Sequence, residues 1–224
     1  MAQLIAASTG QRTEASRRTR RLLFFCGIAS SLLYVGGDIL AAACWSAYSY
    51  TSQSISELLA IGSPARPWLG LIPYNPLVIA FGIGVCWSAG RKWAQRICGI
   101  LIALYGVASQ TGFFMPMHLR GASGSFVDTM HIIITMVIVL FIVLFIGFGS
   151  AGHGKAFRIY SFATLAVLVA FGALAGRQGP QIAANLPTPG LGIMERINVY
   201  SAMLWVAVLA IVLLREERAS ATSR

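Results

Sequence analysis

The segment that decides the fold is TMHIIITMVIVLFIVLFIGFG, residues 129–149. Its 21 residues include one histidine and no aspartate, glutamate, lysine or arginine. A helix of about 20 predominantly apolar residues is long enough to cross the hydrocarbon core of a bilayer. The segment therefore predicts a membrane-spanning helix.

Five other segments have a similar length and composition: Leu22–Trp45, Trp68–Ser88, Ile97–Met115, Ile159–Gly176 and Ile197–Leu214. Of the 224 residues, 57% are hydrophobic and only 11% are charged, whereas soluble domains carry about 25% charged residues. The composition excludes a soluble domain, a disordered chain and a small disulfide scaffold. We predict an all-α polytopic membrane protein, a bundle of six transmembrane helices, with one membrane domain at 22–214 between tails at 1–21 and 215–224.

The basic residues are divided unevenly between the two sides of this predicted bundle. Of the 17 lysines and arginines, thirteen fall in the tails or in the connections after the second and fourth spans. Because an excess of Lys and Arg marks the cytoplasmic side, we predict cytoplasmic termini in a multi-pass protein of the plasma (inner) membrane. The same bias accounts for the net charge of +10. The expected partner is therefore the lipid bilayer and not a nucleic acid.

The acidic residues show the opposite distribution. The four acids outside the tails all fall in the predicted extracytoplasmic half, together with two of the three histidines. We therefore predict a polar site that opens to that side. The candidate ligand-binding residues are Asp38, Ser56, Glu57, His118, Arg120, Asp128, His131, Glu195 and Arg196.

Asp38 is the most informative of these residues, because it lies about four helical turns inside the first span. A carboxylate at membrane depth costs a few kcal/mol and usually faces a cavity or a partner. One interpretation is a carboxylate that binds a ligand or handles protons. The other is a structural ion pair with Arg120 or Arg196, or a position at the outer interface. The sequence leaves these interpretations open.

Two short patterns predict helix starts in the same half of the protein. Ser54-Ile55-Ser56-Glu57 matches a capping box with Ser54 as N-cap, which predicts a short helix along the interface. Glu57 either completes this cap alone or also reaches the polar site. Asp128 and His131 are three residues apart and share a helix face. They are either a helix start and its neighbour, or a carboxylate–histidine pair for proton transfer or metal ligation.

Arg196 lies at the mouth of the sixth span, on the same helix face as Tyr200. It is either a contact for an anion or a lipid phosphate, or a side chain that extends to the interface. The sequence contains no HExxH, Walker, GxSxG or GxGxxG motif. The cofactor therefore stays unknown. No metal site is predicted, and His118 and His131 are the weak candidates for metal ligands.

Several of these motifs occur together in a fixed order. They are Tyr50-Thr51-Ser52-Gln53-Ser54-Ile55-Ser56-Glu57-Leu58 through Gly62-Ser63-Pro64, then Phe114-Met115-Pro116-Met117-His118, the Asp128/His131 pair, and Gly192-Ile193-Met194-Glu195-Arg196. Across six spans this set resembles the membrane family catalogued as domain of unknown function 998, over about Leu22 to Leu214. The resemblance implies a shared signature that includes Ser56, Glu57, His118, Asp128, His131, Glu195 and Arg196, and it implies no established reaction.

Three classes of function follow from the sequence. The first is binding or transport of a small polar or amphipathic ligand, such as a lipid headgroup, at the extracytoplasmic polar site. The second is a structural or assembly factor, in which the polar residues form pairs between helices. The third is a membrane-embedded acid/base or metal-assisted hydrolase, which would need three histidine or acidic ligands to converge. Whether the protein is an enzyme stays open.

Overall fold

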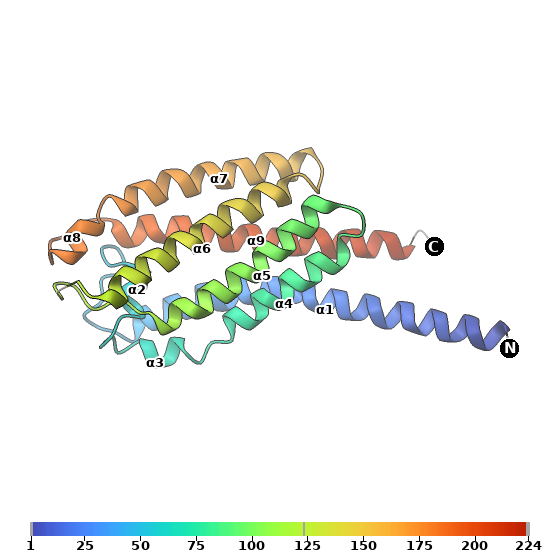
Figure 1. Ribbon diagram of the computed structural model, residues 1–224, viewed down its shortest axis with the longest axis horizontal. Helices are drawn as coiled ribbons and strands as arrows, with labels where there is room; N and C mark the ends of the chain where they lie inside the picture. The colour runs from blue at the N-terminus through green and yellow to red at the C-terminus, as the bar shows by residue number, and fades with distance from the viewer. Residues whose placement is uncertain (1, 123, 223–224) are drawn as a thin grey trace.

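The computed structural model describes residues 2–122 and 124–222 (Figure 1). Apart from a single bridge between Ile61 and His118, the regular structure of these residues is helical. The helices are α1 (Ala2–Ala43), α2 (Ile55–Leu58), α3 (Arg66–Leu69), α4 (Tyr74–Ser88), α5 (Trp93–Phe114), α6 (Phe126–Ser150), α7 (Lys155–Gly176), α8 (Gly179–Ala183) and α9 (Leu191–Thr222). The predicted all-α fold is confirmed.

Within the described residues, six helical segments are long and apolar enough to cross a membrane. They are 14–43, 66–88, 93–114, 126–150, 155–183 and 191–220. Each contains most of one span predicted from the sequence, so the six-span prediction is confirmed. Helix α1 starts at Ala2, and α9 continues to Thr222. The first and the last helix therefore extend beyond the boundaries at 22 and 214 that the sequence predicts for the membrane domain.

The second span differs from the single helix that the sequence predicts. It consists of α3 and α4, with a break at residues 70–73 between them. Pro73 is the N-cap of α4, and its ring removes the backbone N–H that a continuous helix would need there. Proline therefore places the first regular turn of α4 at Tyr74 rather than at Trp68.

The six long helices form a closed ring. The helices α1, α4, α5, α6, α7 and α9 pack each against the next, and α9 also packs against α1. Large side chains fill the interior of the ring. Trp205 of α9 is fully buried against Phe145 of α6 and Phe157 of α7, with ring centroids 5.5 Å apart in both pairs. Its indole N–H donates to the Ser161 hydroxyl over 2.9 Å, so this polar group is satisfied inside the core.

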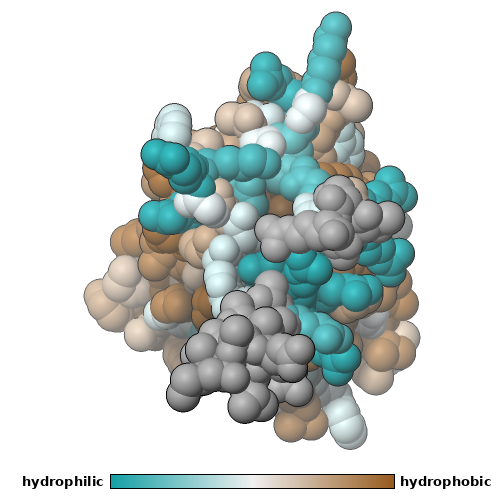
Figure 2. All heavy atoms as spheres, turned by 90° about the vertical axis from the view of Figure 1, so that its right-hand side faces the viewer, coloured by the Kyte–Doolittle hydropathy of each residue, from teal (hydrophilic) through white to brown (hydrophobic). Residues whose placement is uncertain are grey.

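The two ends of the ring differ in structure. Both termini lie at one end, which we call the terminal end, and there α4–α5 and α6–α7 are joined by short connections (Figure 1). Figure 2 views this end, where hydrophilic side chains gather with hydrophobic ones around them. The opposite end carries the connections 44–73, 115–122, 124–125 and 177–190, which we call the cap together with the adjoining ends of the long helices. The cap includes α2, α3 and α8.

Candidate functional site

The cap contains two buried arginine–carboxylate pairs, and the first of them joins α1 to α9. Asp38 and Arg196 are buried, with side-chain exposures of 2% and 4%. Arg196 Nε donates to one carboxylate oxygen of Asp38 over 2.8 Å, and Nη2 donates to the other over 3.0 Å. Such a paired, planar contact is the strongest geometry of an ion pair. Of the alternatives for Asp38, the structure contains the ion pair with Arg196.

The guanidinium of Arg196 uses all of its N–H groups within the protein. Besides its two bonds to Asp38, Nη2 donates to the Tyr48 hydroxyl over 2.8 Å. Nη1 donates to the carbonyl oxygens of Tyr50 (2.7 Å) and Gly192 (3.2 Å). A guanidinium has five N–H groups, so these bonds leave none for another partner. This arrangement differs from the contact with an anion that the sequence also allowed.

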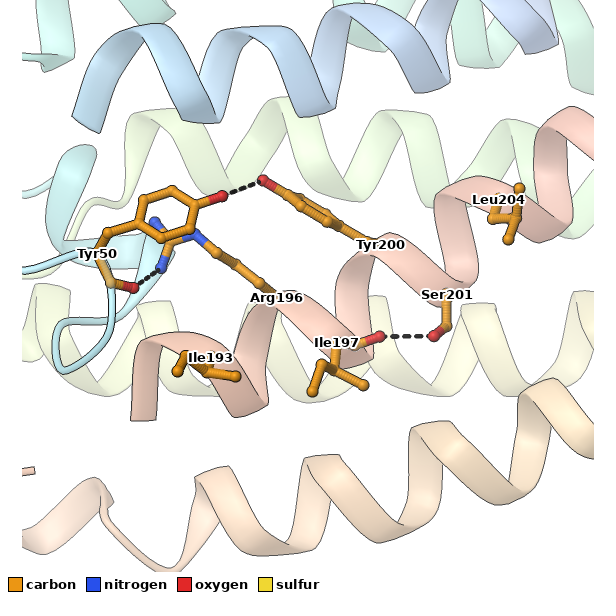
Figure 3. Close-up of a pocket in the computed structure, with 7 residues that line it drawn as sticks. All are labelled: Tyr50, Ile193, Arg196, Ile197, Tyr200, Ser201 and Leu204. Atoms are coloured by element: carbon orange, nitrogen blue, oxygen red, sulfur yellow. Dashed lines mark hydrogen bonds between the residues drawn. The ribbon is translucent and has the colours of Figure 1, made fainter. Parts of the chain in front are cut away.

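Two tyrosines extend this network toward the surface. The Tyr200 hydroxyl donates to Asp38 over 2.5 Å and lies 2.9 Å from the Tyr50 hydroxyl. The Tyr50 ring stacks on the guanidinium of Arg196, with 3.6 Å from Cζ to the ring centroid. The predicted shared face of Arg196 and Tyr200 is confirmed, because both side chains contact Asp38. Figure 3 shows Tyr50, Arg196 and Tyr200, with the bond between the two tyrosine hydroxyls.

Gly192 allows the start of α9 to lie directly against the loop at Tyr50–Gln53. A Cβ atom at this position would lie 2.4 Å from the Tyr50 carbonyl oxygen and 2.5 Å from that of Gln53. Both atoms belong to the backbone, so no side-chain rotation could make room for it. The close approach also lets Ile193 N–H donate to the Thr51 carbonyl over 3.3 Å. Glycine at 192 is therefore a requirement of the Arg196 network.

The second pair joins two loops of the cap. Arg120 Nε donates to Glu57 over 2.5 Å, and Nη2 donates to its other oxygen over 3.0 Å. Nη2 also donates to the Ser52 carbonyl and to the Thr188 hydroxyl, at 3.1 and 2.7 Å. Glu57 is completely buried. The segment 50–57 is therefore bonded to both arginine networks, because Arg196 bonds to it at Tyr50 and Arg120 bonds to it at Ser52.

Glu57 also completes the capping box predicted from the sequence. The Ser54 side chain accepts from the Glu57 backbone N–H, and the Glu57 carboxylate accepts from the Ser54 N–H over 2.7 Å. Burial raises the pKa of Glu57, but bonds from Arg120 and from Ser54 more than offset it, so the pKa lies below its ordinary value. Glu57 is therefore an ionised carboxylate, and it both caps α2 and pairs with Arg120.

Glu195 connects α9 to the same short helix. Its carboxylate accepts from the Ile55 N–H over 2.7 Å, at the first residue of α2. Glu195 and Arg196 thus have separate partners, as expected for adjacent residues on a helix. Ser56 lies on α2 and is half-buried, and the structure records no side-chain hydrogen bond for it among the described residues.

His118 and Asp128 form a third polar group in the cap. Asp128 is the N3 residue of a capping box whose N-cap is Ser125, and it accepts from the His118 backbone N–H over 2.8 Å. His118 Nδ1 lies 3.1 Å from Asp128 and 3.4 Å from the Ser125 hydroxyl. In a serine–histidine–aspartate triad the serine and the acid contact different ring nitrogens. Here both contact Nδ1, so this group is not arranged as such a triad.

His131 has a separate partner, because its Nδ1 lies 3.0 Å from the Met115 carbonyl oxygen. The pair that the sequence suggested between Asp128 and His131 is thus replaced by one between Asp128 and His118. Among the described residues, no group of three or more His, Cys, Asp or Glu side chains is placed to hold a metal ion. Apart from Ser56 and His131, the candidate residues thus belong to ion pairs or bond at the starts of helices.

A groove lies on the outer face of α9, beside the first network (Figure 3). Its volume is about 370 Å³, and it is lined by Tyr50, Ile193, Arg196, Ile197, Tyr200, Ser201 and Leu204. Ile193 and Leu204 are 46% and 58% exposed. In Figure 3, α9 lies between α1 and α7, and Tyr50 and Tyr200 mark one end of the groove. The groove is therefore apolar along its length and polar at the cap.

The sequence did not predict the roles of four residues of this site. They are Tyr48, Tyr50 and Thr188, which bond to the arginines, and Gly192, which allows the close contact of α9 with the loop. Arg196 bonds to Tyr48 and Tyr50, and Arg120 bonds to Thr188. A partial signal was available, because Tyr50 and Gly192 belong to two of the sequence strings that carry the family resemblance. The hydrogen bonds to backbone carbonyl oxygens could not be predicted from the sequence, because they do not depend on the side chain of the accepting residue.

Comparison with known families finds one family model that matches the chain. The model of the family described as "Protein of unknown function (DUF998)" matches residues 28–212. This match covers most of the chain, including all of the buried pairs of the cap, so the chain belongs to the DUF998 family. Comparisons with curated proteins and with solved structures find no match.

Proposed function

We propose that this member of the DUF998 family binds an amphipathic membrane ligand along α9. The apolar tail of the ligand lies on Ile197 and Leu204, and its polar end lies at Tyr50 and Tyr200. The observation that carries this proposal is the groove, which combines an apolar wall with hydroxyl groups at one end. Binding sites for small molecules are typically apolar concavities with a few fixed polar groups.

The dimensions of the groove support a lipid-like ligand. Ile193 and Leu204 are eleven residues apart on one helix, which corresponds to about 16 Å along the axis. That length is about half of a hydrocarbon core of about 30 Å. A single acyl chain in one leaflet fits this depth, and its headgroup would then lie at the cap.

The packing of the ring favours binding at the membrane-facing surface over passage through the bundle. The fully buried side chains of Trp205, Phe81 and Phe145 occupy the interior. A ligand can reach Tyr50 from the lipid side of α9 without displacing them. We therefore propose ligand binding, and transport would require a second arrangement of the helices.

The test compares two tryptophan variants on α9. Leu204 lines the groove, and Ile211 lies seven residues further along the same helix face, outside the groove and 37% exposed. The full-length protein is purified in mild detergent, and the retained lipids are measured by native mass spectrometry. We expect a stoichiometric adduct on the wild type and on Ile211→Trp, and loss of this adduct on Leu204→Trp because the indole fills the groove. Equal retention by both variants would contradict the proposal.

A second candidate function is a structural or assembly role for the cap. It is favoured by the complete internal use of the N–H groups of Arg196, which is typical of a group that holds a fold together. A wild-type chain that carries no adduct in the same experiment would put this role ahead. The hydrolase alternative receives less support, because His118 and His131 bond to different partners.

A further inference from the structure

The hydrogen bonds between the side chains at the polar end of the groove have a fixed order of donor and acceptor. Both carboxylate oxygens of Asp38 accept hydrogen bonds from Arg196, and one of them also accepts from Tyr200. Tyr200 must therefore donate its single hydroxyl hydrogen to Asp38. Because that hydrogen is used, the bond between the two tyrosines must be donated by Tyr50. The chain runs from Tyr50 through Tyr200 to Asp38.

This direction determines what the groove can offer to a ligand. The hydroxyl hydrogens of Tyr50 and Tyr200 are both committed, so only oxygen lone pairs remain. Each lone pair accepts a hydrogen bond and donates none. The carboxylate of Asp38 at the end of the chain polarises both hydroxyl groups and makes their oxygens better acceptors.

Arg196 is the only cation among the described residues that line the groove, and it does not change this conclusion. Its N–H groups are bonded to Asp38, Tyr48 and backbone carbonyls, and its charge is balanced by Asp38. One face of the guanidinium is also covered by the Tyr50 ring. A phosphate or carboxylate would therefore find no free donor at this end of the groove.

From this geometry we infer that the groove selects a membrane lipid whose headgroup donates hydrogen bonds, with a primary ammonium group as the donor. This inference rests on the proposed function and adds the chemistry of the ligand's polar end. The ammonium donates to the oxygens of Tyr50 and Tyr200, and the acyl chain lies on Ile197 and Leu204. The bilayer itself is the source of the ligand, because the groove opens on the lipid-facing side of α9.

Two common lipids provide a matched pair of probes. Phosphatidylethanolamine and phosphatidylcholine have the same net charge, and they differ in whether the headgroup nitrogen carries N–H groups. The purified protein is mixed with equal amounts of the two lipids with identical chains, and the bound ratio is measured by native mass spectrometry. One net hydrogen bond contributes about 1 kcal/mol, so we expect about a five-fold preference for phosphatidylethanolamine.

The variants Tyr50→Phe and Tyr34→Phe make the same chemical change at two places. Tyr50→Phe removes the acceptor at the surface but keeps the ring on Arg196 and the backbone carbonyl that Arg196 uses. Tyr34 lies on α1 and packs on Tyr74, and it is not one of the residues that line the groove. We expect the lipid preference to fall toward one-fold in Tyr50→Phe and to stay at the wild-type value in Tyr34→Phe.

The outcomes separate this inference from the proposed function. Lipid retention that depends on Leu204 but shows no preference between the two lipids would overturn the inference and leave the binding groove in place. A preference for phosphatidic acid over both probes would overturn it in favour of anion recognition. Wild-type protein that retains no lipid at all would overturn both.

Discussion

The two ends of the helix ring use arginine in opposite ways. At the terminal end, Arg91, Lys92 and Arg215 are exposed. At the cap, Arg196 is buried against Asp38, and Arg120 is bonded to a fully buried Glu57. The exposed cations can set the orientation of the protein in the membrane, while the buried ones fix the positions of loops. The contribution of a charged side chain to the structure of this protein therefore depends on whether the side chain is in contact with water.

The largest difference between the two ends should appear when Arg196 is removed. Arg196→Ala leaves Asp38 buried without its cation, which costs about 3–5 kcal/mol of unfolding free energy. The matched control is Arg91→Ala at the terminal end, where an exposed site changes stability by about 0.5 kcal/mol or less. Chemical unfolding in mild detergent measures both. Similar losses in the two variants would show that the cap pair is not structural.

A smaller effect is expected at Glu57, and it should depend on pH. Glu57→Gln removes a charge that bonds to Arg120, at a cost of about 1.5–3 kcal/mol at neutral pH. The pKa of Glu57 is lowered in the folded protein, so the stabilisation is present above its ordinary value of 4.5 and is lost as the pH falls below it. The melting temperatures of wild type and variant should therefore converge as the pH is lowered from neutral to well below 4.5.

The control for this prediction is Glu14→Gln. Glu14 pairs with Arg18 on α1, and its side chain is 65% exposed. Because an exposed pair contributes little, the difference between this variant and the wild type should not vary with pH. Parallel melting curves for Glu57→Gln would contradict an ionised, paired Glu57.

The close approach at Gly192 should be sensitive to a single methyl group. Gly192→Ala places a Cβ atom within 2.5 Å of two backbone oxygens, and overpacking of this kind costs about 1–3 kcal/mol. At Gly176 a Cβ atom would meet nothing within 4 Å, so Gly176→Ala on α7 should be neutral or slightly stabilising. Unfolding of the two variants in detergent gives the comparison. A tolerated alanine at 192 would mean that α9 can move away from the loop.

The smallest effect is expected at the ion pair of the terminal end. Arg20 donates to Glu217 over 2.6 Å, with side-chain exposures of 22% and 13%. Partial contact with water reduces the value of such a pair to about 0–1 kcal/mol. Arg20→Ala should therefore cost less than Glu57→Gln in the same assay. A larger cost would remove the contrast between the two ends.

The fold followed from the sequence more completely than the site did. Six apolar segments of sufficient length fix six helices, because the bilayer demands that length and composition. The sequence predicts one continuous span where the structure has a break before Tyr74. Pro73 and Pro76 are compatible with either a kink or a new helix start. Apolar composition alone does not distinguish these two outcomes.

The partners within the site were harder to predict. Asp38 had two candidate arginines on the same side, and its partner lies 158 positions away in the sequence. Helical spacing suggested His131 as the neighbour of Asp128, but the loop after α5 brings His118 to that carboxylate instead. The capping box of Ser54 and Glu57 was predicted from the sequence, and that of Ser125 and Asp128 was not, although in both boxes the bonds join residues three apart.

The pairing of α1 with α9 has a consequence for the order in which the protein is made. Asp38 leaves the ribosome with the first span, and Arg196 follows only with the sixth. Until then α1 carries an unpaired acid, at an insertion cost of about 2.5–3.5 kcal/mol if it is ionised at the bilayer centre. The last third of the chain also supplies the partners of the Tyr48 hydroxyl and of the carbonyl oxygens of Tyr50 and Ser52. The Arg196 network can therefore form only after the sixth span has been made, so its formation requires all six spans.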